Sequence, residues 1–135
     1  MKVVIIDGQG GKMGQMIIER IKSASVPCEI NAVGTNSIAT SAMLKAGADT
    51  GATGENPVIV ASRDADVIIG PIGIIAADSL LGEITPAMAV AVGQSSAKKL
   101  LLPVNLCNNI VIGAGSQPMA KLIAEAVEKL AEILQ

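Results

Sequence analysis

A glycine-rich loop near the start of the chain has the residue types and spacing to hold a phosphate group. It follows an apolar run and reads Gly8-Gln9-Gly10-Gly11-Lys12-Met13-Gly14. Gly8 permits a tight turn, Gly10 or Gly11 lets a phosphate approach the backbone, and Gly14 lets the next helix pack closely on a sheet. Free N–H groups at the positive end of that helix would face the ligand, and Lys12 adds a positive charge.

The cofactor expected from this loop is NADP, or else NAD. Met13 occupies the last position of a strict Gly-x-Gly-x-x-Gly fingerprint, so the match is to looser glycine spacings. The acid that contacts the ribose in an NAD site, roughly twenty residues further on, is missing. Thr35, Asn36 and Ser37 stand there, and small hydroxyl and amide groups suit a ribose 2′-phosphate better than a carboxylate does. The alternative is a glycine-rich turn that serves backbone geometry only.

Two carboxylates, Asp7 and Glu55, are the candidates for catalysis. Asp7 lies directly before the loop and would repel a phosphate unless Mg²⁺, water or the loop N–H groups intervene. An equally weighted interpretation is that Asp7 only fixes the loop. Glu55 precedes Asn56-Pro57, which predicts a helix N-cap at Asn56, and Glu55 has no capping role in that arrangement. No metal site is assigned.

The composition excludes several classes of function. The chain has 135 residues, of which 50% are apolar and 16% charged, and it has no His, Phe, Tyr or Trp. Histidine-based triads and histidine metal sites are therefore excluded, and a bound base would lie between aliphatic side chains. With a net charge of −2, nucleic acid is not an expected partner. Two distant cysteines, Cys28 and Cys107, and no apolar run long enough for a membrane span predict a cytoplasmic protein.

Alternation of short apolar runs with longer amphipathic segments predicts an α/β fold. We expect one Rossmann-like domain over residues 1–135, three layers thick, with a mostly parallel sheet and helices on both faces. The expected strands are residues 2–6, 29–34, 48–50, 66–69, 99–102 and 110–112. The expected helices are residues 11–24, 37–46, 58–62, 74–81, 87–94 and 119–134.

Several polar or glycine-rich loops follow the expected strands. They include Thr35, Asn36 and Ser37 after the second strand, Glu55 after the third, and Gly70, Ile72 and Gly73 after the fourth. In an open parallel sheet these loops share one edge, where ligands bind. Together with the first glycine loop, they form the predicted binding site for a small phosphorylated ligand or nucleotide.

The glycine loop resembles the start of dihydrodipicolinate reductase, where Gly-x-Gly-Gly-Arg/Lys-Met-Gly binds NAD(P)H. That resemblance implies cofactor contacts at Gly8, Gly11, Lys12 and Met13. It covers about 20 residues, and the histidine-rich catalytic segment of that enzyme has no counterpart here.

Nearly the whole chain is similar to a small bacterial family catalogued as a domain of unknown function. The likeness is carried by Ile6–Gly11, Gly34–Met43, Gly51–Asn56 and Ile69–Ile74. It implies a Rossmann-like fold and no established activity.

Three functions remain open from the sequence. The first is a nucleotide-binding sensor or accessory protein, and the second is an enzyme that uses Asp7, Glu55 and Lys12 on a phosphorylated metabolite. The third is a scaffold without a ligand. We also expect a homodimer or higher homo-oligomer, because residues 86–93 form a helix that is apolar all round. The alternative is that the C-terminal helix covers that helix.

Overall fold

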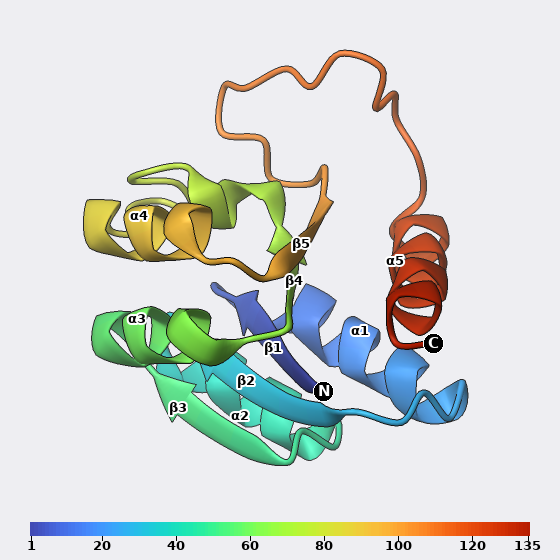
Figure 1. Cartoon of the computed structure of the whole chain (residues 1–135). Coiled ribbons are helices and arrows are strands. Elements are labelled where there is room, and N and C mark those ends of the chain that lie inside the picture. Colours follow the sequence, from blue (N-terminus) through green and yellow to red (C-terminus); the bar gives the residue numbers. More distant parts are fainter.

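A computed structural model describes all 135 residues and contains one five-stranded sheet (Figure 1). The strands, in chain order, are β1 (Lys2–Asp7), β2 (Glu29–Gly34), β3 (Thr50–Thr53), β4 (Val67–Pro71) and β5 (Lys98–Leu102). They lie in the order β3-β2-β1-β4-β5, and every pairing is parallel. The predicted Rossmann-like α/β class is confirmed.

Helices cover both faces of this sheet. They are α1 (Lys12–Ser23), α2 (Ser37–Lys45), α3 (Glu55–Asp64), α4 (Pro86–Gln94) and α5 (Met119–Ile133), with a short 3₁₀ helix η1 (Ile72–Ile75). Side chains alternate along β1, so Val3 and Ile5 pack with α1 and α5, whereas Val4 and Ile6 pack with α3 and α4. All four side chains are fully buried, which explains the unbroken apolar run in the sequence.

The strand order reverses direction between β1 and β4. From β1 the chain moves outward through β2 to β3, then returns to place β4 on the other side of β1. Such a switch point leaves a crevice beyond the carboxyl ends of the two strands, because the two connections diverge there. The glycine loop after β1 and η1 after β4 both lie at this edge.

Two expected elements are wrong. Residues 74–81 do not form a helix, because the chain leaves η1 and enters turns in which Asp78, Leu80 and Leu81 have positive φ angles. Residues 110–112 do not form a strand: Ile110 and Ile112 are 85% and 91% exposed, in a loop that stands away from the fold (Figure 1). An apolar β-branched run predicts a strand only where a neighbouring strand is available.

Three further expectations need adjustment. The third strand is β3 at Thr50–Thr53, two residues later than expected, and the following helix is longer than expected at both ends. The C-terminal helix does not cover α4, because α5 packs against α1 and β5 on the opposite face of the sheet. None of the helices has the length and apolar character of a membrane span.

Candidate functional site

The glycine loop turns sharply after β1 and enters α1 at Gly11. Gly11 is the N-cap residue, with a φ of 74°, a left-handed conformation that glycine adopts without strain. A Cβ at Gly11 would lie 2.7 Å from the Cα of Ala39 in α2, so a side chain there would push α1 and α2 apart. At Gly14 an added Cβ would meet the Met43 side chain, as expected for a glycine that allows close helix packing.

Asp7 holds this loop in shape. Its Oδ1 accepts a hydrogen bond from the Gly8 amide at 2.8 Å, and its Oδ2 accepts one from the Gly14 amide at 2.7 Å. Burial raises the pKa of Asp7, the two amides oppose that rise, and the negative charge of Glu83 adds to it. The carboxylate therefore serves as a cap for the start of α1, which has no other side-chain cap.

Glu83, which the sequence analysis missed, is the central acid of this edge. Its Oε1 accepts from the Gln9 amide at 2.9 Å, from Thr35 Oγ1 at 2.5 Å and from Asn36 Nδ2 at 2.8 Å. Burial alone would raise the pKa of Glu83, but these hydrogen bonds outweigh it and lower the pKa below the usual value. Glu83 lies in the connection between β4 and α4. Glu55 was selected because it follows an expected strand, and the same criterion applies to Glu83. The sequence analysis missed it because a helix was expected at residues 74–81, between the fourth strand and Glu83.

The turn after β2 is tied to the glycine loop. Asn36 caps α2 by accepting from the Ala39 amide at 2.9 Å, and its Nδ2 also donates to the Gln9 carbonyl at 2.9 Å. Thr35 donates to Glu83, whereas Ser37 is exposed and makes no side-chain hydrogen bond. The structure thus brings Thr35 and Asn36 to the loop and leaves Ser37 at the outer margin.

Glu55 lies in a different hydrogen-bond group. The expected cap at Asn56 is wrong: the N-cap of α3 is Gly54, with a φ of 109°, and Glu55 is the first helical residue. A carboxylate there interacts favourably with the helix dipole. Its Oε1 accepts from Thr85 Oγ1 at 2.6 Å, and Thr85 caps α4. Glu55 thus links the starts of α3 and α4 and shares no hydrogen bond with Asp7 or Glu83.

Gly70 within β4 and Gly73 after it serve close packing. A Cβ at Gly70 would lie 2.5 Å from the carbonyl oxygen of Ile6 in β1. The carbonyl of Gly73 accepts a hydrogen bond from the Ser79 hydroxyl, which joins η1 to the following turn. Ile72 is partly buried beside them in η1. These three residues lie at the predicted edge, and their side chains supply no polar group.

The loop amides fall into two groups. Four are already bonded within the chain: Gly8 and Gly14 to Asp7, Gln9 to Glu83, and Gly11 to the Gly8 carbonyl. The sequence predicted free loop amides and left open that Asp7 fixes the loop; four amides are in fact bonded, because two carboxylates and the Gly8 carbonyl accept from them. The amides of Gly10, Lys12 and Met13 make no hydrogen bond within the chain; Gly10 and Lys12 are exposed, whereas Met13 is buried and its amide helps to lower the pKa of Asp7.

Comparison with known proteins gives a family and no activity. Residues 2–135 match the family described as "Domain of unknown function (DUF3842)". The chain belongs to the DUF3842 family. No curated protein matches this DUF3842 chain. A crystal structure of a dodecameric FMN-dependent Ubix-like decarboxylase from Escherichia coli O157:H7 aligns with 13% identity and a TM-score of 0.43, over 99% of this chain and 94% of the other.

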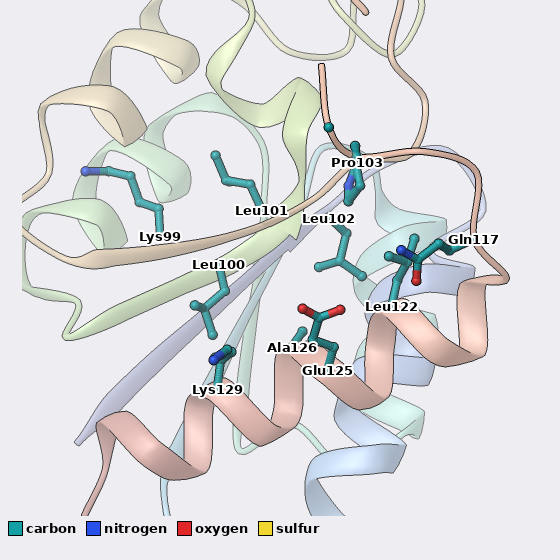
Figure 2. A pocket seen from close by; sticks show the side chains of 12 residues that line it. Lys99, Leu100, Leu101, Leu102, Pro103, Gln117, Leu122, Glu125, Ala126 and Lys129 are labelled. Carbon is teal, nitrogen blue, oxygen red and sulfur yellow. The ribbon is translucent and has the colours of Figure 1, made fainter. Parts of the chain in front are cut away.

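One hollow of the DUF3842 protein lies away from the glycine loop. Figure 2 shows this cavity of about 370 Å³, which β5 and α5 line with Leu100, Leu102, Leu122 and Ala126. None of the predicted site residues lines it. A second, open hollow runs along α2 from Ser37 to Lys45 and is bordered by Gln15 of α1. No three His, Cys, Asp or Glu side chains come together as a metal site would require.

Proposed function

We propose that this DUF3842 protein binds a nucleotide, with a phosphate on the glycine loop, and acts as a cytoplasmic sensor or accessory protein. The observation that carries the proposal is the pair of exposed, unbonded amides at Gly10 and Lys12 at the start of α1. An anion there gains two N–H donors and the favourable end of the helix dipole. The Lys12 side chain is also exposed and adds a positive charge.

The position of the loop in the sheet also supports this proposal. It lies at the carboxyl end of β1, beside the β1–β4 switch point, where open α/β sheets bind their ligands. The residues that contact the ligand would be Gly8–Gly14, Thr35 and Asn36. A dinucleotide such as NAD or NADP is the class of cofactor that fits them. Residues 1–135 would act as one domain. The free thiols of Cys28 and Cys107 are in keeping with a reducing compartment.

An enzyme acting through Asp7 and Glu55 on a phosphorylated metabolite has less support. Asp7 is 5% exposed and both of its oxygens accept loop amides. Glu55 accepts from Thr85 in a separate group. A scaffold without ligand would leave the exposed Gly10 and Lys12 amides without a role beyond hydration.

The test is nucleotide binding by the wild type and by Gly10→Val. A Cβ at Gly10 meets nothing within 4 Å and its φ is not positive, so the variant should fold. Its branched side chain would stand over the free amides. We expect ADP, NAD or NADP to raise the melting temperature of the wild type and to have no effect on Gly10→Val.

Ala24→Val is the control, because Ala24 is exposed at the C-terminal end of α1, at the opposite end of that helix from the glycine loop and outside α4. It should respond to the nucleotide as the wild type does. Equal responses of wild type and Gly10→Val would contradict binding at the loop. If neither a nucleotide nor phosphate raises the melting temperature of the wild type, a scaffold without a ligand is the remaining interpretation.

The protein is also proposed to form a homo-oligomer through α4. Val90 on α4 is 53% exposed, although Met88, Ala89 and Val92 of the same helix are buried. Val90 lines a groove between α3 and α4 together with the apolar Ile59, Ala87 and Ala91, and polar residues that include Arg63 complete its walls. A two-fold axis would let Val90 of each copy enter the groove of the other, so the same patch serves both copies.

A further inference from the structure

Glu83 presents one bonded and one free carboxylate oxygen to the ligand edge. Oε1 accepts all three hydrogen bonds, from Gln9, Thr35 and Asn36, whereas Oε2 accepts none. Three donors hold Oε1 in place, and Oε2 keeps its full capacity to accept a hydrogen bond. Gly8 leaves the room for this arrangement, since a Cβ there would lie 2.6 Å from Thr35 Oγ1 and 3.0 Å from Glu83 Oε1.

The position of Glu83 indicates which group of a ligand its free oxygen could bind. In folds of this architecture an acid at the end of the second strand accepts hydrogen bonds from the ribose of a dinucleotide whose phosphates lie on the glycine loop. Here β2 ends at Gly34 and the next residue is Thr35, so no acid is present locally. Glu83 instead reaches the same turn from the β4–α4 connection, 48 positions further along the chain.

We propose that Glu83 is the specificity-determining residue of the nucleotide site and that its Oε2 accepts a hydrogen bond from a ribose hydroxyl. This inference rests on the proposed function, because the phosphates must lie on the glycine loop for the ribose to reach Glu83. It reverses the cofactor expected from the sequence. An ionised carboxylate at the ribose favours a free 2′-hydroxyl and repels a 2′-phosphate, so NAD and ADP are the fitting ligands.

The charge on Glu83 supports this choice. Its hydrogen bonds lower the pKa below the usual value, so the carboxylate is ionised at neutral pH. Asp7 is also part of this edge. A second phosphate beside these acids would meet repulsion, whereas a hydroxyl would supply the donor that Oε2 lacks.

A competing interpretation is that Glu83 occupies the place of the ligand's own phosphate and leaves when the ligand binds. The two interpretations predict opposite effects of Glu83→Gln. A glutamine can keep its oxygen toward the three donors and places an NH₂ group where Oε2 was. If Glu83 accepts the ribose, the variant binds ADP more weakly; if Glu83 is an internal plug, the variant binds ADP more tightly.

The experiment is calorimetric titration of ADP and of adenosine 2′,5′-bisphosphate into wild type, Glu83→Gln and Glu55→Gln. We expect the wild type to prefer ADP, and Glu83→Gln to lose about five- to tenfold in ADP affinity, because a hydrogen bond to a charged acceptor is replaced by a weaker one from a neutral NH₂ group to the hydroxyl. The same variant should gain affinity for the 2′-phosphorylated nucleotide. Glu55→Gln should behave as the wild type, because Glu55 lies in another hydrogen-bond group.

The outcomes separate this inference from the proposed function. Nucleotide binding that Gly10→Val abolishes, with an unchanged preference in Glu83→Gln, would overturn the role of Glu83 and keep the site. Tighter ADP binding by Glu83→Gln would overturn it in favour of the internal plug. A wild type that binds neither nucleotide would overturn both proposals. Thermal unfolding of each variant confirms that the comparison is between folded proteins.

Discussion

The Glu83 carboxylate lies 2.5 Å from the Thr35 hydroxyl, although 48 positions separate the two residues in the chain. This hydrogen bond joins the segment before α4 to the turn after β2, across the carboxyl ends of β1 and β4. With the Gln9 amide as a further donor, three loops meet on one carboxylate oxygen. The arrangement of the candidate site depends on this junction.

Glu83 should make stability depend on pH in the acid range. Its pKa in the folded protein is lowered from the usual 4.5. The stabilisation is therefore fully present above that usual value and is lost as the pH falls through the lower folded value. Urea unfolding between about pH 6 and pH 3 should show a steeper loss of stability for wild type than for Glu83→Gln. Parallel curves for the two proteins would contradict the role assigned to these hydrogen bonds.

Replacing Asp7 by asparagine should destabilise the fold. The two amides of Gly8 and Gly14 need two acceptor oxygens, and asparagine offers one. Leaving a buried amide unpaired costs about 1–3 kcal/mol, which denaturant unfolding measures directly. Part of this loss is offset because burial raises the pKa of Asp7, so the ionised form is itself disfavoured. The exposed Asp64→Asn is the control, and an equal effect of both changes would show that Asp7 does not hold the loop.

Leu81→Gly should stabilise the protein. Leu81 has a φ of 56° and its side chain is 94% exposed, so it carries backbone strain without burying surface. A left-handed conformation costs a non-glycine residue about 1–2 kcal/mol, and the gain is reduced by the greater freedom of glycine in the unfolded chain. We expect a net gain of about 0.5–1 kcal/mol in unfolding free energy. Leu81→Ala keeps a Cβ and should give no such gain; an equal gain for both would exclude relief of strain as the cause.

Light scattering should find an assembly larger than one chain of 13.6 kDa at micromolar concentration. Val90→Lys should shift it toward the monomer, because a charge would have to be buried in the groove between α3 and α4. Ile112→Lys changes another exposed apolar residue, in the loop after β5, and should leave the assembly intact. A wild-type mass of 13.6 kDa without concentration dependence would show that α4 needs no second copy.

Local patterns were sufficient for the elements that support the site. The sequence alone predicted a first strand at residues 2–6, one residue shorter than Lys2–Asp7, the bounds of Glu29–Gly34, and helices that overlap α2 and α4. Each depends on interactions within a few residues: an unbroken apolar run, a cap side chain or a glycine at a turn. The parallel sheet followed from their alternation.

Only the tertiary structure decided which polar groups meet. The Gln9 amide and the Glu83 carboxylate are 74 positions apart, and no periodicity links them. Residues 110–112 also show that tertiary structure decides: they have the residue types of a strand, but the sheet ends at β5 and they do not pair with it. Sequence patterns report the preferences of each segment, whereas a carboxylate that accepts three hydrogen bonds from two distant loops depends on how those segments pack. For this reason the glycine loop was predicted from the sequence, and the acid that completes its edge was not.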